Sequence, residues 1–371
     1  MHIASIGIDL GKTTFHLVAL GERNQILLRK KFLRSQLLAY TANLPASLIG
    51  LEACAGAHFL GGKLGEQGHQ VRLIPAQFVK PYRKSNKNDF LDAEAIAEAV
   101  TKQNMRFAQL KTQEQLDGQA MHRVRDRLVQ RRTALLHEIR GFLLERGIPF
   151  AAQPIHLRKN LPGVIEDGER NLSPRLRWRL DRMWQEWKPI ETEVQAIREE
   201  IERISNADAR CRQLRQIPGF GPLISTATVA AIGNGAAFRR GRDFAAWVGV
   251  VPRQYSTGGK QKLYGIRQRG HVDLRRMLIH GARAVLFRVQ YDTGGFGQWV
   301  HRLAQRAPHN KVVVAIANKL ARIAWAVLSS GRDYRHQPLR QLAAAGWPLK
   351  RRYAWKAQNA FHFSTATTTG G

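Results

Sequence analysis

The chain has 371 residues and a formal charge of +31, because 59 lysines and arginines face 28 aspartates and glutamates. Apolar residues make up 44% of it, enough for sizeable cores, and the length suggests two or three domains of about 100–200 residues each. This charge attracts a polyanion, usually nucleic acid, without deciding between an enzyme and a packaging protein.

The sequence also argues against a disulfide-stabilised secreted protein and against a membrane protein. The two cysteines, Cys54 and Cys211, rule out a disulfide scaffold and fit a reducing cytoplasm. Asp9 interrupts the apolar stretch near the N-terminus, so no cleavable signal is expected. The apolar segment 312–328 contains a lysine and an arginine and is too short to span a bilayer. We therefore expect a cytoplasmic protein that is not bound to a membrane.

The first hundred residues have an α/β pattern. Three β-rich runs separated by short polar breaks predict an antiparallel meander, after which helices and strands alternate. The expected strands are 3–10, 13–20, 25–33, 47–52 and 70–74, with helices at 35–43 and 56–67. This is the order of a ribonuclease-H-like domain, and we assign residues 1–108 to it.

The next region, 109–208, is helical and basic and forms an expected coiled-coil arm. A helix is predicted over 112–146, and a second helical run follows a polar loop. Apolar residues recur in this second run at heptad spacing, so it should pack against the first helix or against a second subunit. Pro189 lies inside the run, where we expect a kink or a helix start. The seam residues are Leu180, Met183, Trp187, Ile190, Val194, Ile197, Ile201 and Ile204.

The region 209–345 is predicted to be mainly helical with glycine-rich joints. A basic tail, 346–371, follows, and its Thr/Gly-rich end is expected to be disordered.

Four carboxylates of the first region are candidate metal ligands. Asp9 ends the first predicted strand and Glu52 ends the fourth, and these two strands are neighbours in a ribonuclease-H-like sheet. Asp89 and Asp92 share a helix face because they are three residues apart. Clustered carboxylates repel one another, and divalent cations relieve that repulsion. Hard oxygen ligands suit Mg²⁺, which stabilises both oxygens of a phosphodiester displacement.

The same region allows plainer interpretations. Asp89 and Asp92 are also common N-terminal helix residues. The segment 7–13, Gly-Ile-Asp-Leu-Gly-Lys-Thr, is similar to the first phosphate loop of the actin/sugar-kinase fold. That fold needs a second Asp-Gly-rich loop and an adenosine motif, and neither is found.

The segment 217–222, Ile-Pro-Gly-Phe-Gly-Pro, lies between two predicted helices and has the helix-hairpin-helix pattern. Gly219 and Gly221 would let the turn approach a nucleic-acid backbone, where the second helix's free amides face a phosphate. Such contacts position the backbone and read no sequence. The alternative is a plain helix–helix turn.

A serine on a glycine-flanked loop is the candidate nucleophile. Ser256 precedes Gly258-Gly259, and a hydroxyl there is accessible to a substrate. Alone, a serine in a turn is more often a turn former. Basic residues follow it that would balance a phosphate: Lys260, Lys262, Arg267 and Arg269. His271 and His280 lie in a basic helical run and are interpreted as surface or nucleic-acid-contacting residues.

At these positions the sequence resembles a known family. Residues 83–93, Arg-Lys-Ser-Asn-Lys-Asn-Asp-Phe-Leu-Asp-Ala, preceded by 75–80, are similar to the second acidic motif of the IS one-ten (Piv/MooV-type) insertion-sequence transposases. Residues 252–278, with a Ser-Thr-Gly-Gly-Lys core, resemble that family's C-terminal signature. The agreement covers nearly the whole chain in order.

The resemblance implies a DNA recombinase with a RuvC-like domain at 1–108 and a transposase domain at 209–345. Its Asp-Glu-Asp-Asp tetrad would fall on Asp9, Glu52, Asp89 and Asp92, and its nucleophile on Ser256. It implies Mg²⁺, a covalent serine–DNA intermediate, a bridge RNA that pairs with donor and target DNA, and dimers that form tetramers. The tetrad and the serine of one site would come from different subunits.

Basic residues beside the second acidic motif, Arg83, Lys84 and Lys87, are further candidates for nucleic-acid binding. Two rival functions remain open at this point. One is a RuvC-like nuclease or Holliday-junction resolvase in which water attacks the phosphodiester and Ser256 is structural. The other is a non-enzymatic nucleic-acid scaffold.

Overall fold

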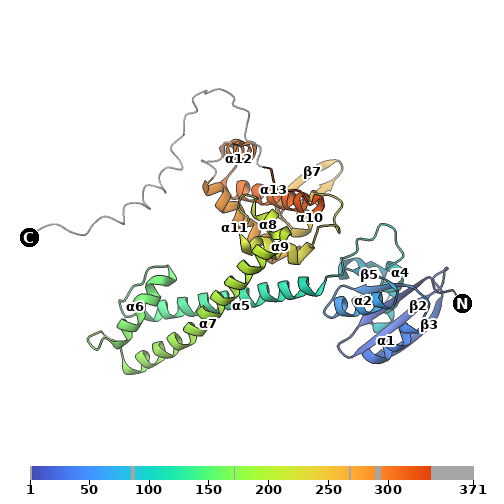
Figure 1. Ribbon diagram of the computed structural model, residues 1–371, viewed down its shortest axis with the longest axis horizontal. Helices are drawn as coiled ribbons and strands as arrows, with labels where there is room; N and C mark the ends of the chain where they lie inside the picture. The colour runs from blue at the N-terminus through green and yellow to red at the C-terminus, as the bar shows by residue number, and fades with distance from the viewer. Residues whose placement is uncertain (1, 85–87, 171, 267–268, 289–293, 336–371) are drawn as a thin grey trace, which may run out of the picture.

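The computed structural model describes residues 2–84, 88–170, 172–266, 269–288 and 294–335. Figure 1 shows a sheet with its helices at the N-terminal end, a long helical arm, and a cluster of helices in the C-terminal third. The predicted disorder of the tail concerns residues outside the described ranges. The same holds for Lys87 and Arg267, whose expected contacts stay predictions.

The N-terminal sheet confirms the strands and helices predicted from the sequence, each within two residues. The strands are β1 (Ser5–Leu10), β2 (Thr14–Leu20), β3 (Ile26–Leu33), β4 (Leu48–Glu52) and β5 (Gln70–Ile74), and the helices are α1 (Arg34–Ala42) and α2 (Ala57–Glu66). The order is β3-β2-β1-β4-β5. β1 pairs antiparallel with β2 and parallel with β4, so the first and fourth strands are neighbours as predicted.

One helix lies unusually close to this sheet because β1 has a glycine at the point of contact. Short helices α3 (Ala76–Val79) and η1 (Lys80–Tyr82) lead to α4 (Asp89–Ala99). A Cβ at Gly7 would lie 2.0 Å from the carbonyl oxygen of Ala93, so only glycine fits. Packing accounts for Gly7 without a phosphate loop. The close approach places the first turn of α4 beside the ends of β1 and β4.

The arm consists of α5 (Gln113–Leu144), α6 (Pro154–Glu166) and α7 (Pro174–Ala207) (Figure 1). The predicted seam of α7 faces α5 and α6 of the same chain, and it encloses buried leucines such as Leu135, Leu143 and Leu161. Of the two expected partners, the first helix is therefore the one found. The part of the seam from Leu180 to Val194 is therefore covered within one chain.

Pro189 lies inside α7, which begins at Pro174 after the Ser173 cap. The predicted helix start at Pro189 is therefore wrong. A proline in a helix interior removes one hydrogen bond and costs about 3 kcal/mol. Trp187 and Ile190 on either side of it are buried in the arm core, and this packing offsets the loss.

The C-terminal region is mainly helical, as predicted, and has a single core. Its helices are α8 (Ala209–Arg215), α9 (Pro222–Ile232), α10 (Gly241–Val248), α11 (Val272–Arg288), α12 (Gly295–Arg306) and α13 (His309–Ser330). Within the described residues, α13 alone is long and apolar enough to cross a membrane, and half of its most apolar window is buried. Its buried residues belong to the same core as those of α10 and α11.

The segment around the candidate serine departs from the sequence prediction. Instead of a loop it forms a two-stranded antiparallel hairpin, β6 (Pro252–Thr257) and β7 (Lys260–Ile266). The turn between the strands is Gly258-Gly259, where both φ values are positive (54° and 74°), as a two-residue hairpin turn of type I′ requires. Ser256 is paired with Gln261 and is therefore a strand residue and not a turn former.

Candidate active site

Four carboxylates gather at one edge of the N-terminal sheet. Asp9 lies near the end of β1 and Glu52 is the last residue of β4. These strands are parallel neighbours, so their carboxyl ends meet. Asp89 and Asp92 lie in the first turn of α4, which Asn88 caps by accepting a hydrogen bond from the Phe90 amide. The structure thus brings together all four predicted acids.

The electrostatics of Asp9 show how close these charges are. Partial burial, followed by the charges of Asp92, Asp89 and Glu52, raises the pKa of Asp9 from 3.8 to about 6. His16 acts in the opposite direction and lowers it. The cluster therefore carries negative charge that the neighbouring residues neutralise only in part, which is the condition under which carboxylates take up a cation or a proton.

His16 was missed by the sequence analysis. It lies on β2 directly opposite Asp9, its Nδ1 is 3.6 Å from an Asp89 oxygen, and its ring packs edge-on against Phe90. The available signal was a polar residue within the apolar run Thr14–Leu20. Without the register of β1 against β2, that signal does not say which acid His16 faces.

Arg83 lies among the acids. Its Nε is 2.7 Å from Asp92 Oδ1 and its Nη2 is 3.7 Å from Glu52 Oε2. The Asp92 residue is only 3% exposed. A guanidinium therefore supplies positive charge between two of the four carboxylates. The expectation that Arg83 binds nucleic acid is untested, but in this conformation its partners are acids.

Lys84, the next candidate, points to a different acid. Its Nζ is 2.9 Å from Glu94 Oε1, and Arg29 is 2.9 Å from the other Glu94 oxygen. Its predicted role in nucleic-acid binding likewise stays a prediction.

The donor chemistry of this cluster suits a divalent cation, because carboxylate oxygens are hard ligands. The ligand geometry is not assembled, however. In the ranges that the structure describes, no three His, Cys, Asp or Glu side chains are placed to hold one metal ion. Arg83 stands between Glu52 and Asp92, where a cation would have to compete with it. The carboxylates are therefore suitable ligands for a divalent cation, but their side chains are not arranged around one ion position.

Ser256 lies on the exposed β6–β7 hairpin. Gln254 Nε2 donates a hydrogen bond of 2.8 Å to its Oγ, which orients the hydroxyl. Lys260 and Lys262 are exposed on β7, and Arg269 is exposed beyond it. The hairpin extends from the C-terminal helices, apart from the N-terminal sheet (Figure 1). Within one chain, Ser256 and the four acids are therefore not brought together.

The helix-hairpin-helix segment joins α8 to α9, as predicted. Gly219 has a φ of 84°, and a Cβ there would lie 2.7 Å from the carbonyl oxygen of Gly281 on α11. This close contact explains Gly219 by packing within the chain. Gly221 precedes Pro222 at the start of α9, where backbone amides are free of helical partners. Contact of either glycine with nucleic acid stays a prediction.

A mixed α/β domain with clustered carboxylates, joined to a strongly basic helical region, is typical of an enzyme that acts on nucleic acid. Comparison with known proteins identifies the family of enzymes. Residues 6–147 match a family model of DEDD transposases of the IS110 type, and residues 211–298 match the model described as "Transposase IS116/IS110/IS902 family".

Two relatives extend this similarity over most of the chain. The transposase for insertion sequence element IS1328 of Yersinia enterocolitica is 42% identical over 330 residues, covering 89% of this chain and 98% of that relative. The transposase for insertion sequence element IS1111A of Coxiella burnetii is 39% identical over 333 residues, covering 90% and 92%. The chain belongs to the IS110/IS116 family of insertion-sequence transposases, which cleave and recombine DNA.

Proposed function

We propose that this transposase cleaves and exchanges DNA strands through a covalent intermediate on Ser256, with Mg²⁺ held by Asp9, Glu52, Asp89 and Asp92. The N-terminal part, residues 1–108, is a RuvC-like domain, 109–208 is an arm, and 209–345 is a transposase domain. A bridge RNA selects donor and target DNA, and dimers assemble into tetramers at the nucleoid in the bacterial cytoplasm.

One observation carries the proposal: Asp9 and Glu52 on neighbouring parallel strands meet Asp89 and Asp92 of the first turn of α4. Burial, and then the three other acids, raise the pKa of Asp9 accordingly. Four acids from two strands and a helix meet in a chain whose net charge is +31. Repulsion among these four acids lowers the stability of the fold, and a bound cation would offset that repulsion. The strand order β3-β2-β1-β4-β5 supports the RuvC-like assignment. When bound, Mg²⁺ would stabilise the charge on the phosphodiester oxygens.

The hairpin supplies the nucleophile. Attack by Ser256 Oγ on phosphorus forms one P–O bond and breaks another, so a phosphodiester is kept and the released DNA hydroxyl can later reverse the step. Gln254 Nε2 donates to Oγ and so positions the hydroxyl without accepting its proton. The serine proton therefore passes to a base other than Gln254. The exposed Lys260 and Lys262 lie on the same hairpin and attract the DNA strand.

The test is Ser256→Ala, with Thr257→Val as the matched control on the same strand. We expect Ser256→Ala to abolish both strand exchange and a protein–DNA adduct that survives denaturation, while DNA binding stays within about twofold because phosphate contacts elsewhere are unchanged. Thr257→Val should retain both activities. Strand exchange by Ser256→Ala at the wild-type rate would contradict the nucleophile assignment.

A second candidate function is a nuclease or junction resolvase in which water attacks. It is favoured by the separation of Ser256 from the acids within one chain. It predicts cleavage without any denaturation-resistant adduct, and cleavage that Ser256→Ala leaves intact. The same two measurements therefore decide between the candidates.

A further inference from the structure

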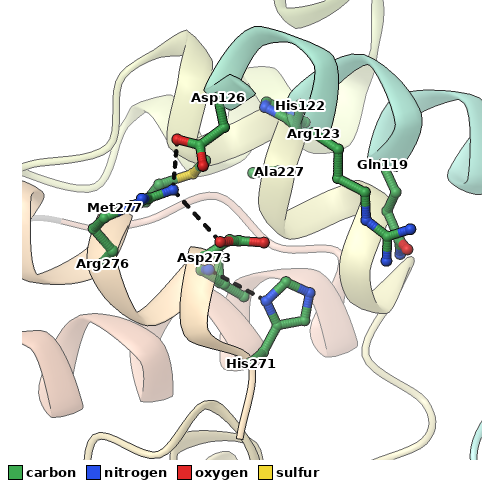
Figure 2. A pocket seen from close by; sticks show the side chains of 10 residues that line it. Gln119, His122, Arg123, Asp126, Ala227, His271, Asp273, Arg276 and Met277 are labelled. Carbon is green, nitrogen blue, oxygen red and sulfur yellow. Dashed lines mark hydrogen bonds and ion pairs between the residues drawn. The ribbon is translucent and has the colours of Figure 1, made fainter. Parts of the chain in front are cut away.

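A cavity lies where the arm meets the C-terminal helices (Figure 2). Its walls come from the first half of α5, from Ala227 of α9, and from the start of α11 with His271 just before it. His271 follows the last residue of β7, Ile266, by five positions, so the cavity lies near the base of the Ser256 hairpin. None of the contacts proposed above for Mg²⁺ or Ser256 uses it.

The acids of the cavity are already paired. Arg276 Nη2 is 2.7 Å from Asp126 and 3.4 Å from Asp273, and Figure 2 shows it between the two. Arg123, by contrast, is exposed and has no carboxylate partner among the residues that the structure describes. The cavity therefore offers one unpaired guanidinium.

A second unpaired cation lies beside it. Lys111 precedes α5 and is half-buried, and its Nζ donates to Gln119 Oε1 at 3.2 Å. Gln119 is itself fixed by donating to the Ala230 carbonyl. Within the described ranges no carboxylate pairs with Lys111. Burial, and then the charge of Arg123, lower the pKa of Lys111, so the two cations repel each other in the free protein.

His271 completes the group with a neutral donor. Its Nδ1 accepts the Leu274 amide at 3.2 Å, so the proton of the neutral ring is on Nε2. In Figure 2 that second ring nitrogen faces the side of the cavity where Arg123 and Gln119 lie. Burial lowers the pKa of His271, Asp273 opposes this, and Lys111 and Arg123 lower it further. The ring is therefore neutral and remains a donor.

We propose that Lys111, Arg123 and His271 form a binding site for a backbone phosphate of nucleic acid, which guides the strand toward the Ser256 hairpin. Arg123 and His271 line the cavity, and Lys111 lies beside it through its hydrogen bond to Gln119. An ammonium, a guanidinium and an N–H donor suit the several oxygens of a phosphodiester. Binding would remove the repulsion between Lys111 and Arg123. The site depends on the proposed function only because nucleic acid is taken as the anion. Both DNA and a bridge RNA carry the backbone phosphate that it would bind.

The experiment measures binding by the full chain, by fluorescence anisotropy over a range of salt concentrations. The probes are a random-sequence DNA duplex and an RNA hairpin, because phosphate contacts need no particular sequence. Arg123→Gln and Lys111→Gln remove the two cations. Arg158→Gln on α6 is the matched control, since it removes an equally exposed charge that has no ion pair in the described part of the chain.

We expect each cavity variant to weaken binding about tenfold, as for a lost charge-assisted hydrogen bond. The slope of log affinity against log salt should fall by about 0.9 for the DNA probe. Arg158→Gln should match the wild type. A change with one probe supports the site and identifies its nucleic acid. Cavity variants that equal Arg158→Gln with both probes would overturn it. Strand exchange is not measured, so failure of the serine mechanism would leave this result unaffected.

Discussion

Asp9 links the charge of the acid cluster to the stability of the fold. Its pKa is 3.8 in a free chain and about 6 in the folded protein, mainly through burial and then the neighbouring acids. Between these two values the folded protein binds more protons than the unfolded chain. Its stability must therefore fall as pH rises through that window, and the loss persists above it.

In metal-free protein containing EDTA, we expect Asp9→Asn to melt at a higher temperature than the wild type at pH 7. The difference should shrink as pH falls from 6 to 4, where the wild-type carboxyl is protonated. Differential scanning calorimetry across this range measures it. Glu22→Gln, an exposed acid in a turn, is the control and should show no such trend. A wild-type advantage at pH 7 would contradict the strain assigned to the cluster.

Arg83 competes with any cation for two of the acids, since it contacts both Asp92 and Glu52. We therefore expect Arg83→Gln to bind Mn²⁺, a spectroscopic substitute for Mg²⁺, several-fold more tightly than the wild type. The free protein should also melt at a lower temperature, because Asp92 is almost fully buried and loses the ion pair with Arg83 that offsets its charge.

The matched control for this prediction is Lys84→Gln. It removes the neighbouring cation, which pairs with Glu94 and contacts neither Asp92 nor Glu52. Electron paramagnetic resonance of free Mn²⁺ measures the affinity without any DNA or turnover. Equal or weaker Mn²⁺ binding by Arg83→Gln would show that Arg83 assists the ion and does not compete with it.

At the scale of elements, the sequence predicted those parts that are marked by a continuous apolar run or by a helical repeat of apolar residues. β1 and β2 are buried along almost their whole length, and the seam of α7 is buried at heptad spacing. The hairpin β6–β7 was missed because almost every position in it is exposed, so no alternation of polar and apolar residues marks it. The Gly258-Gly259 pair was the one feature of the sequence that indicated a hairpin turn.

The candidate site divides in the same way. The meeting of Asp9 and Glu52 follows from strand order, which sequence patterns specify, and Asp89 and Asp92 follow from helix spacing. The place of Arg83 depends on the path of the chain between β5 and α4, which no periodic pattern determines. Arg123 and His271 line one cavity because α5 and α11 both pack against α9 and Arg276 of α11 pairs with Asp126 of α5, contacts between residues far apart in the chain.

At the scale of the whole molecule, the two halves of the proposed active site lie in separate parts of one chain. Much of the seam of α7 is covered within the arm of the same chain. In a symmetric dimer each subunit can offer its hairpin to the acids of its partner. That arrangement reconciles the covalent serine mechanism with the observed separation, and it has a direct genetic test.

Neither Asp9→Asn nor Ser256→Ala should exchange strands alone. If the site is shared, a mixed dimer contains one site with an intact acid cluster from one subunit and an intact serine from the other. Random mixing makes half of the dimers mixed, so about one site in four is intact, and activity should return to about a quarter of wild type. If each chain uses its own serine, no dimer contains an intact site and the mixture stays inactive. Co-purification from cells expressing both variants, followed by the strand-exchange assay, measures this directly, and two copies of the same variant serve as the control.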